Sequence, residues 1–293
     1  MEINTYPHPS TTPSMRDSAE HTPASSPQAE LLPLSVIIIT KNEARHIAAC
    51  LESVRFAREV IVLDSNSTDD TAEIARQFGA VVHQSPDWPG FGVQKNRALS
   101  FATQPWVLSI DADERVSEAL KIEILQTLSS PVSNGYFLPR LSELCGQPIR
   151  HSGWWPDYVL RLFRRECGYF TEAIVHERVE VTGPTAKLQA CLLHYPYETL
   201  DALILKMNRY STDAATMMAA QGKSAGVLSI IGHGVWTFIR IYLLRRGFLD
   251  GRYGFVLAVT AASGSFFRYS KLMMLSRAKR ESKATRESKN HLK

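Results

Sequence analysis

Short apolar runs alternate with stretches of helical periodicity along the first half of the chain. Residues 34–40 and 59–63 are rich in β-branched apolar side chains, which is typical of strands covered on both faces of a parallel sheet. Segments with apolar residues three or four positions apart follow these runs, and this spacing predicts amphipathic helices. Further runs at 80–83 and 106–110 continue the alternation, so the sequence predicts a doubly wound α/β sheet.

The pattern changes after residue 135 and again after residue 199. Between these positions, short strand-like pieces alternate with Gly and Pro loops, and we expect them to complete the sheet and build one side of a site. From residue 199, an apolar stripe at helical spacing predicts helices. Residues 1–33 are rich in Pro, Ser and Thr without apolar periodicity, which indicates a disordered tail. We therefore predict a catalytic domain over 34–198, a helical region over 199–280 and a disordered basic tail over 281–293.

Composition narrows the class of protein. Of the 293 residues, 44% are hydrophobic and 21% are charged, as in an ordinary globular protein. The formal net charge of +4 is too small to indicate a nucleic-acid partner. The four cysteines form no CxxC pair and indicate reduced thiols. The first residues do not show a basic start followed by an apolar core, so the sequence predicts no secretory signal.

Polar residues follow three of the predicted strands at the position where each strand ends. The first strand ends in Thr40–Glu43, the second in Asp64–Asp69 and the fourth in Asp111–Glu114. Because ligands bind at the carboxyl ends of strands in open α/β sheets, we expect these clusters to meet in one crevice. Asp111 and Asp113 stand two positions apart, so both carboxylates can face one cation such as Mg²⁺ or Mn²⁺.

The motifs between residues 34 and 197 resemble those of the inverting GT-A glycosyltransferases of family 2. The carrying segments are Val36-Ile-Ile-Ile-Thr-Lys-Asn-Glu43, Val62-Leu-Asp-Ser-Asn-Ser-Thr-Asp-Asp-Thr71 and Ile110-Asp-Ala-Asp-Glu114. A narrower resemblance, to the lipopolysaccharide core β-glucosyltransferase group, rests on residues 88–96, 153–157, 161–165, 175–177 and 246–251. It implies a GT-A, Rossmann-like sheet that moves a hexose, expected to be glucose, from a UDP-sugar to an inner-core or similar glycolipid.

The resemblance also implies roles for single residues. It assigns the nucleotide-sugar site to Thr40, Asn42, Glu43, Asp64, Ser65, Gln94, Lys95, Asn96, Asp111 and Ala112. It assigns the divalent metal ion, Mg²⁺ or Mn²⁺, to Asp111 and Asp113, with His194 as an expected further ligand. We expect acceptor contacts from Trp154, Trp155, Arg161 and Arg164.

The acceptor hydroxyl must lose its proton as it attacks, and a carboxylate on the far face of the sugar can take it. The resemblance places this catalytic base at Glu177, in the segment Ala173-Ile-Val-His-Glu177. The chain lacks the Glu-Asp dipeptide of many relatives, and Asp157 is the alternative base. In-line attack then inverts the anomeric carbon.

Two apolar segments of the helical region, Gly226–Leu244 and Gly254–Leu275, are interrupted by charged residues. Aromatic-rich helices edged with Arg and Lys suit the membrane interface, so we expect a peripheral or monotopic protein at the cytoplasmic face of a bacterial inner membrane. A helical cap on the catalytic domain or an oligomer contact is the alternative to membrane binding.

For the reaction, the alternative is transfer to a polyprenyl phosphate or to another glycolipid or polysaccharide. If the protein is not an enzyme, the alternative is a catalytically inactive membrane scaffold that binds nucleotide.

Overall fold

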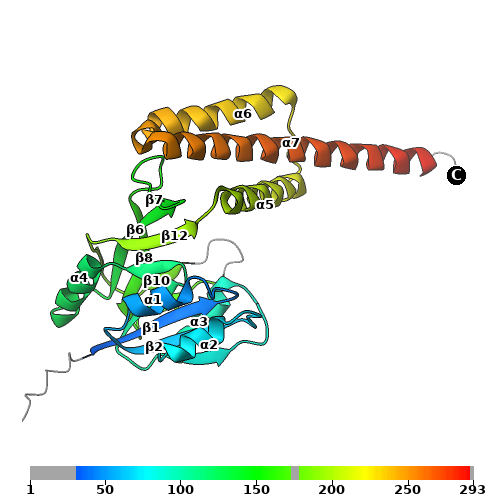
Figure 1. Ribbon diagram of the computed structural model, residues 1–293. Coiled ribbons are helices and arrows are strands. Elements are labelled where there is room, and N and C mark those ends of the chain that lie inside the picture. Colours follow the sequence, from blue (N-terminus) through cyan, green and yellow to red (C-terminus); the bar gives the residue numbers. More distant parts are fainter. Residues whose placement is uncertain (1–30, 173–177, 291–293) are drawn as a thin grey trace, which may run out of the picture. The chain divides into compact units, whose positions relative to one another are not determined.

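The computed structural model describes residues 31–172 and 178–290 (Figure 1). The larger of its two sheets has the strand order β3-β2-β1-β4-β8-β6-β12-β5. Its first four strands in this order are parallel, and helices connect them along the chain. These strands and helices are β1 (Leu32–Thr40), α1 (Ile47–Ser53), β2 (Ala57–Asp64), α2 (Thr71–Gln77), β3 (Val81–Gln84), α3 (Phe91–Ser100) and β4 (Trp106–Asp111).

The second part of the sheet is mixed. Its elements are β5 (Glu114–Val116), α4 (Glu118–Ser129), β6 (Gly135–Leu144), β7 (Gln147–Pro148), β8 (Asp157–Arg164), β11 (Thr185–Lys187) and β12 (Leu192–Tyr197). Strand β8 joins the two parts, since it pairs antiparallel to both β4 and β6. The strands β9 (Gly168–Phe170) and β10 (Val179–Val181) form a separate antiparallel pair.

Side chains of β1 alternate between two cores, which explains its unbroken apolar sequence. Val36 and Ile38 pack in the core under α1 and α4, whose members include Ile47 and Leu120. Ile37 faces the other way and packs with α3 residues such as Ala98. Helices therefore cover both faces of the parallel strands, and the predicted α/β class is confirmed.

The helical region consists of α5 (Leu200–Ala220), α6 (Val227–Ile239), a π-helical turn at Arg240–Leu244, a 3₁₀ turn at Gly247–Asp250 and α7 (Gly251–Asn290). Helices α6 and α7 run side by side (Figure 1). Helix α5 packs on α7 through a cluster of Ala215, Ala219 and Leu272. It also contacts the sheet, because Leu203 shares a core with Leu144 and Ile149.

The boundaries differ slightly from those that the sequence predicts. Strand β1 begins at Leu32, two residues before the predicted start of the catalytic domain, and α5 begins at Leu200. Helix α7 continues to Asn290, past the predicted end of the helical region at residue 280. Most of the predicted N-terminal tail lies outside the described residues.

Candidate active site

Three adjacent parallel strands end in polar residues at one edge of the sheet. Thr40 at the end of β1 lies opposite Asp64 of β2, and Ile39 lies opposite Asp111 of β4. The Thr40 hydroxyl donates a hydrogen bond of 3.1 Å to Asp64 Oδ1. The three clusters that the sequence singles out are therefore neighbours.

The loop after β2 supports the loop after β1. The Asn42 backbone N–H donates to Ser67 Oγ, and the Asn42 side-chain carbonyl accepts from the Thr68 N–H, both at 2.8 Å. Asn42 adopts a left-handed backbone conformation with φ 57°, which Asn tolerates better than most residues. Asp64 is 1% exposed, and its Oδ2 accepts a hydrogen bond from the Ser67 N–H at 3.0 Å. Asp64 therefore stabilises the loop after β2, which in turn holds the loop after β1.

Several residues predicted to bind nucleotide are buried behind the strand ends. The Gln94 amide donates to Ser65 Oγ at 2.8 Å, and both residues are buried. Asn96 exchanges two hydrogen bonds with the backbone of Phe170, at 2.8 and 2.9 Å. These contacts fix α3 against the sheet and β9, while direct contact of these side chains with a nucleotide stays a prediction.

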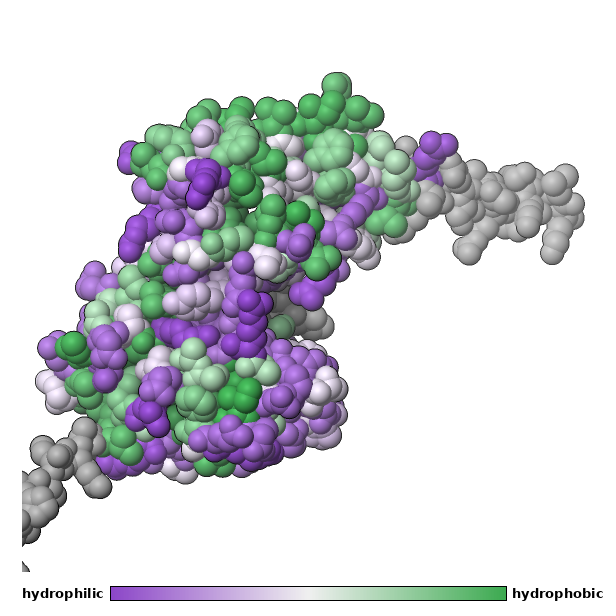
Figure 2. Space-filling model, in the orientation of Figure 1, coloured by the Kyte–Doolittle hydropathy of each residue, from purple (hydrophilic) through white to green (hydrophobic). Residues whose placement is uncertain are grey.

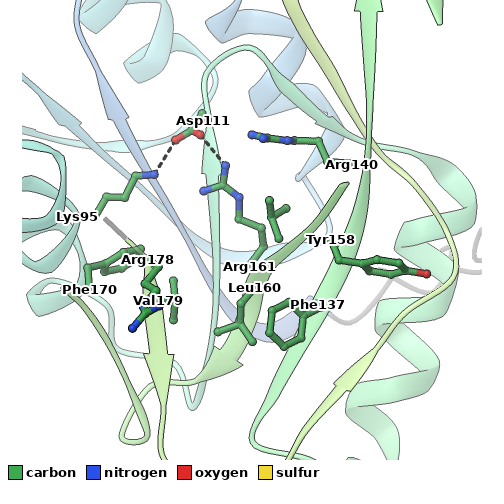
Figure 3. Close-up of a pocket in the computed structure, with 11 residues that line it drawn as sticks. Lys95, Asp111, Phe137, Arg140, Tyr158, Leu160, Arg161, Phe170, Arg178 and Val179 are labelled. Carbon is green, nitrogen blue, oxygen red and sulfur yellow. Dashed lines mark hydrogen bonds and ion pairs between the residues drawn. The ribbon is translucent and has the colours of Figure 1, made fainter. Parts of the chain in front are cut away.

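Asp111 lies between two cations (Figure 3). Lys95 Nζ of α3 is 3.1 Å from Asp111 Oδ1, and Arg161 Nη2 of β8 is 2.6 Å from Oδ2. Burial alone would raise the pKa of Asp111, but the charges of Arg161 and Lys95 outweigh this and hold the pKa well below its usual range. Asp111 is therefore an anchored, ionised carboxylate.

The ion pairs continue from Asp111 to the other side of the site. Arg161 also contacts Glu114 Oε1 at 2.7 Å, and the fully buried Glu114 accepts from the Asp111 N–H at 2.9 Å. Arg140 of β6 contacts Glu114 at 3.2 Å and Asp157 at 2.6 Å. Among the described residues, Lys95, Arg161 and Arg140 thus alternate with the carboxylates of Asp111, Glu114 and Asp157 in one ion-pair network.

Asp113 and His194 lie in contact at the same end of the sheet, beside the ion-pair network. Asp113 Oδ2 lies 3.5 Å from His194 Nε2, and His194 Nδ1 shares a hydrogen bond of 2.8 Å with Ser142 Oγ. The Ser142 contact orients the imidazole with Nε2 toward Asp113. Burial would raise the pKa of Asp113, but the hydrogen bond and charge of His194 leave it below its usual value.

A cavity of about 730 Å³ joins these features, and we call it the donor cavity after the nucleotide-sugar role that the sequence predicts for several of its residues. Its lining residues are Ile39, Thr40, Lys41, Asn42, Glu43, Trp88, Phe91, Asp111, Ala112, Asp113, Arg140, His194, Lys206 and Arg209. The residues that follow β1 and β4 therefore line one cavity, as predicted. Asp64 of β2 does not line this cavity and instead stabilises the loops beside it.

The donor cavity fits a divalent cation. Burial is the main cause that raises the pKa of Glu43 to about 7, and the nearby carboxylates of Asp113, Asp69 and Asp111 raise it further. A divalent cation would offset the repulsion among these carboxylates. Within residues 31–172 and 178–290, no group of three or more His, Cys, Asp or Glu side chains forms a complete metal site. Asp113 and His194 are donors suited to Mn²⁺, and a substrate diphosphate commonly supplies further oxygen ligands.

A second cavity, of about 460 Å³, shares Arg140, His194 and Lys206 with the donor cavity. We call it the acceptor cavity after the role that the sequence predicts for Trp154, which lines it. Aromatic side chains of Trp154, Tyr197 and Tyr210 and the carboxylate of Asp157 line it. Apolar rings beside polar groups suit a sugar, whose faces are apolar and whose edges carry hydroxyls.

The other predicted acceptor residues lie elsewhere. Trp155 stacks with Arg150, whose guanidinium is 5.7 Å from the ring centre. Arg161 is buried within the ion-pair network rather than at the acceptor cavity. Arg164 lies 4.8 Å from the ring centre of Trp106, at the opposite end of β4 from Asp111. Glu177 lies outside the described residues.

Comparison with known proteins decides the family. Residues 35–165 match the profile described as Glycosyl transferase family 2. An uncharacterized glycosyltransferase of Rickettsia prowazekii is 33% identical over 260 residues, which cover 83% of this chain and 87% of that protein. This chain belongs to glycosyltransferase family 2. The predicted family resemblance and the GT-A type of fold are thereby confirmed.

Another relative of this family 2 glycosyltransferase has a more specific description. The lipopolysaccharide core biosynthesis glycosyltransferase LpsC of Rhizobium meliloti is 33% identical over 254 residues, covering 82% of this chain and 92% of LpsC. Among solved structures, S. aureus TarS 1-349 in complex with UDP-GlcNAc is 14% identical with a TM-score of 0.43, covering 85% of this chain and 92% of that chain. At that distance, the structure says nothing about the ligands of this glycosyltransferase.

Four residues that line or support the site of this family 2 glycosyltransferase had no individual role predicted from the sequence. They are Glu114, Arg140, Lys206 and Arg209. Glu114 directly follows the Asp-Ala-Asp motif, so its position beside the two aspartates was a usable signal. The other three stand alone in β6 and α5, and only the fold brings them to the strand ends.

Proposed function

We propose that this family 2 glycosyltransferase moves a hexose, with glucose as the first candidate, from a UDP-sugar to the inner core of lipopolysaccharide or a similar glycolipid. The observation that carries the proposal is the donor cavity, where Asp113, His194 and Glu43 gather at the carboxyl ends of parallel strands. The lipopolysaccharide acceptor is supported by the similarity to LpsC over most of both chains.

We assign metal binding to Asp113 and His194, together with the donor diphosphate. When bound, the divalent ion stabilises the negative charge that develops on the leaving diphosphate. The chain's own cations serve a different purpose, because Lys95 and Arg161 hold Asp111 ionised and fixed at the edge of the donor cavity. A fixed carboxylate is placed to orient the nucleotide part of the donor without reorganising during the reaction.

For the catalytic base we propose Glu177, with Asp157 as the alternative. The next residue in the chain, Arg178, lines a cavity of about 530 Å³ together with Asp111 and Arg140, which supports this assignment. Asp157 lines the acceptor cavity, but its Oδ2 accepts hydrogen bonds of 3.0 and 2.6 Å from Arg140. An oxygen occupied by a guanidinium is less available for a proton, which favours Glu177. Loss of that proton during in-line attack would give an inverted, β-linked product.

We also propose that the helical region binds the cytoplasmic face of a bacterial inner membrane. Figure 2 shows apolar residues gathered over this region. Among the described helices, Val227–Leu244 alone has the length and hydropathy to cross a membrane, and only 11% of this segment is buried. The exposed Arg240 lies near the end of this segment and the exposed Arg245, Arg246 and Arg252 follow it, where they suit anionic lipid.

The proposed reaction is tested by incubating the protein with Mn²⁺ and a panel of UDP-sugars and measuring the release of UDP. We expect one UDP-hexose to be consumed faster than the others, and faster still when a truncated lipopolysaccharide core is added. Product analysis should show a β-linkage from the α-linked donor. If no UDP-sugar is consumed with or without any glycolipid, the proposed donor class is wrong.

A further inference from the structure

Two cations of the helical region line the donor cavity. Lys206 and Arg209 belong to α5, which begins after the catalytic sheet ends at Tyr197. They stand three positions apart, so they occupy neighbouring positions on one face of the helix. The donor cavity is therefore formed by the sheet and by α5 together.

Among the described residues, these two cations have no carboxylate partner, unlike the other cations of the site. Lys95, Arg140 and Arg161 each form an ion pair with a carboxylate. In the part of the chain that the structure describes, Lys206 and Arg209 form none and instead lie over aromatic rings. Lys206 Nζ is 4.9 Å from the ring centre of Tyr197, and the Arg209 guanidinium is 5.5 Å from that of Tyr210.

Unbalanced positive charge beside a cavity favours an anionic ligand. Two like charges one helical turn apart repel each other, and an anion between them removes this cost. The aromatic contacts hold the charged groups in place at little expense in desolvation. Arg209 can bind two phosphate oxygens at once, while Lys206 acts as a point charge.

Helix α5 is held firmly enough to place these side chains. On the sheet side, Leu203 packs in a core with Leu144 and Ile149. On the other side, Lys271 Nζ of α7 donates hydrogen bonds of 2.7–3.1 Å to Asn208, Ser211 and Thr212 of α5. The turn of helix that carries Lys206 and Arg209 lies between these two attachments.

We propose that Lys206 and Arg209 bind the phosphates of the donor nucleotide diphosphate, so that α5 completes the donor site. This inference rests on the proposed function. The strand-end carboxylates and His194 then meet the diphosphate through a divalent ion, while α5 meets its remaining negative charge directly. A lipid phosphate has the same chemistry, but the two cations share their cavity with Thr40, Asn42 and Asp113, which places them in the donor site.

The test is calorimetric titration of the full chain, in detergent and Mn²⁺, with UDP and separately with uridine. Lys206→Ala and Arg209→Ala should each weaken UDP binding about tenfold, which is the usual size of one charge-assisted hydrogen bond. Uridine carries no phosphate, so its affinity should stay unchanged. Lys206→Arg should bind UDP more tightly than Lys206→Ala, because the charge is retained.

Lys223→Ala is the matched control, since Lys223 is an exposed cation in the turn after α5 and should leave UDP affinity unchanged. Unaltered UDP affinity in both alanine variants would overturn the inference. So would variants that lose binding to vesicles of phosphatidylglycerol while they keep UDP affinity, because the cations would then serve lipid. A wild-type protein that binds no nucleotide diphosphate would instead overturn the proposed function itself.

Discussion

At the scale of single residues, the site depends on charges that are matched inside the protein before any substrate arrives. Arg161 is the centre of this arrangement, since its Nη2 contacts both Asp111 and Glu114. Its side chain is 8% exposed, and Glu114 is fully buried. Removing the carboxylates of Asp111 and Glu114 from water costs free energy, and their attraction to the Arg161 guanidinium compensates this cost.

Arg161→Met should therefore destabilise the protein. The substitution leaves Asp111 and Glu114 without a shared cation, and breaking a buried ion pair in this way typically costs about 3–5 kcal/mol. Urea denaturation of the wild type and the variant measures the free energy of unfolding. Arg55→Met, at an exposed ion pair with Glu52, is the control and should change it by less than about 1 kcal/mol. Equal effects of the two substitutions would contradict the role given to Arg161.

The identity of the base is a second question at this scale. Glu177→Gln should lower turnover about 1,000-fold, because general-base catalysis commonly contributes 10²–10⁴-fold. Its affinity for UDP with Mn²⁺ should stay near that of the wild type. Asp157→Asn is the matched comparison and should retain more activity. The reverse order of the two activities would transfer the role to Asp157.

At the scale of elements, the 3₁₀ turn before α7 holds the loop that leads to the acceptor cavity. Asp250 is 4% exposed at its side chain and accepts hydrogen bonds from the Arg150 and His151 backbone N–H groups and from the Ser152 hydroxyl, at 2.8–3.1 Å. This loop continues into Trp154 and the start of β8. The helical region thus fixes the backbone beside the acceptor cavity.

Asp250→Ala should loosen this loop. It leaves several donors without their acceptor, and we expect a loss of about 2–4 kcal/mol of stability. Hydrogen exchange should show faster exchange of the Arg150 and His151 amides, while amides of β1 keep their protection. Unchanged exchange at residues 150 and 151 would show that Asp250 does not hold the loop.

The sequence predicts strands and site residues well where an apolar run is followed directly by polar residues. The apolar runs ending at Thr40 and Asp111 mark buried parallel strands, and the polar residues that follow identify the site edge. Partners from the mixed part of the sheet and from α5 could not be predicted. Arg140 and Lys206 have no local motif, and their placement depends on the strand order and on how α5 packs. For the same reason Arg161 and Arg164, two arginines of β8, lie beside opposite ends of the neighbouring strand β4.

At the scale of the whole molecule, the helical region combines an apolar surface with a part in the active site. Exposed apolar side chains on α6 include Leu228, which is 88% exposed, together with Ile231 and Val235. An apolar surface of this kind costs free energy in water and favours contact with lipid. The proposed acceptor is amphiphilic, so an enzyme that sits at the membrane meets it directly.

Replacing Leu228, Ile231 and Val235 together by Gln should release the protein from the membrane. Three large apolar side chains then no longer enter the lipid, which should weaken partitioning by about 100-fold or more. Fractionation of cell lysates without detergent measures the share of protein in the membrane pellet. Val132→Gln removes an apolar side chain that is 80% exposed outside the helical region, and it should change nothing. A wild-type protein that stays in the soluble fraction would contradict membrane binding.

The central claim is that Asp113 and His194 bind a divalent ion that holds the donor diphosphate at the strand ends. Calorimetric titration of UDP into the wild type, in Mn²⁺ and then in excess EDTA, tests it most directly, with Asp113→Asn as the variant and Glu118→Gln, an exposed carboxylate of α4, as the control. We predict that UDP binds tightly only with Mn²⁺ and that Glu118→Gln leaves this binding unchanged. Asp113→Asn should weaken it by about 100-fold or more, because loss of a residue that only supports a metal ligand already costs about 10–100-fold. UDP binding that is equally tight in EDTA, or in Asp113→Asn, would contradict the claim.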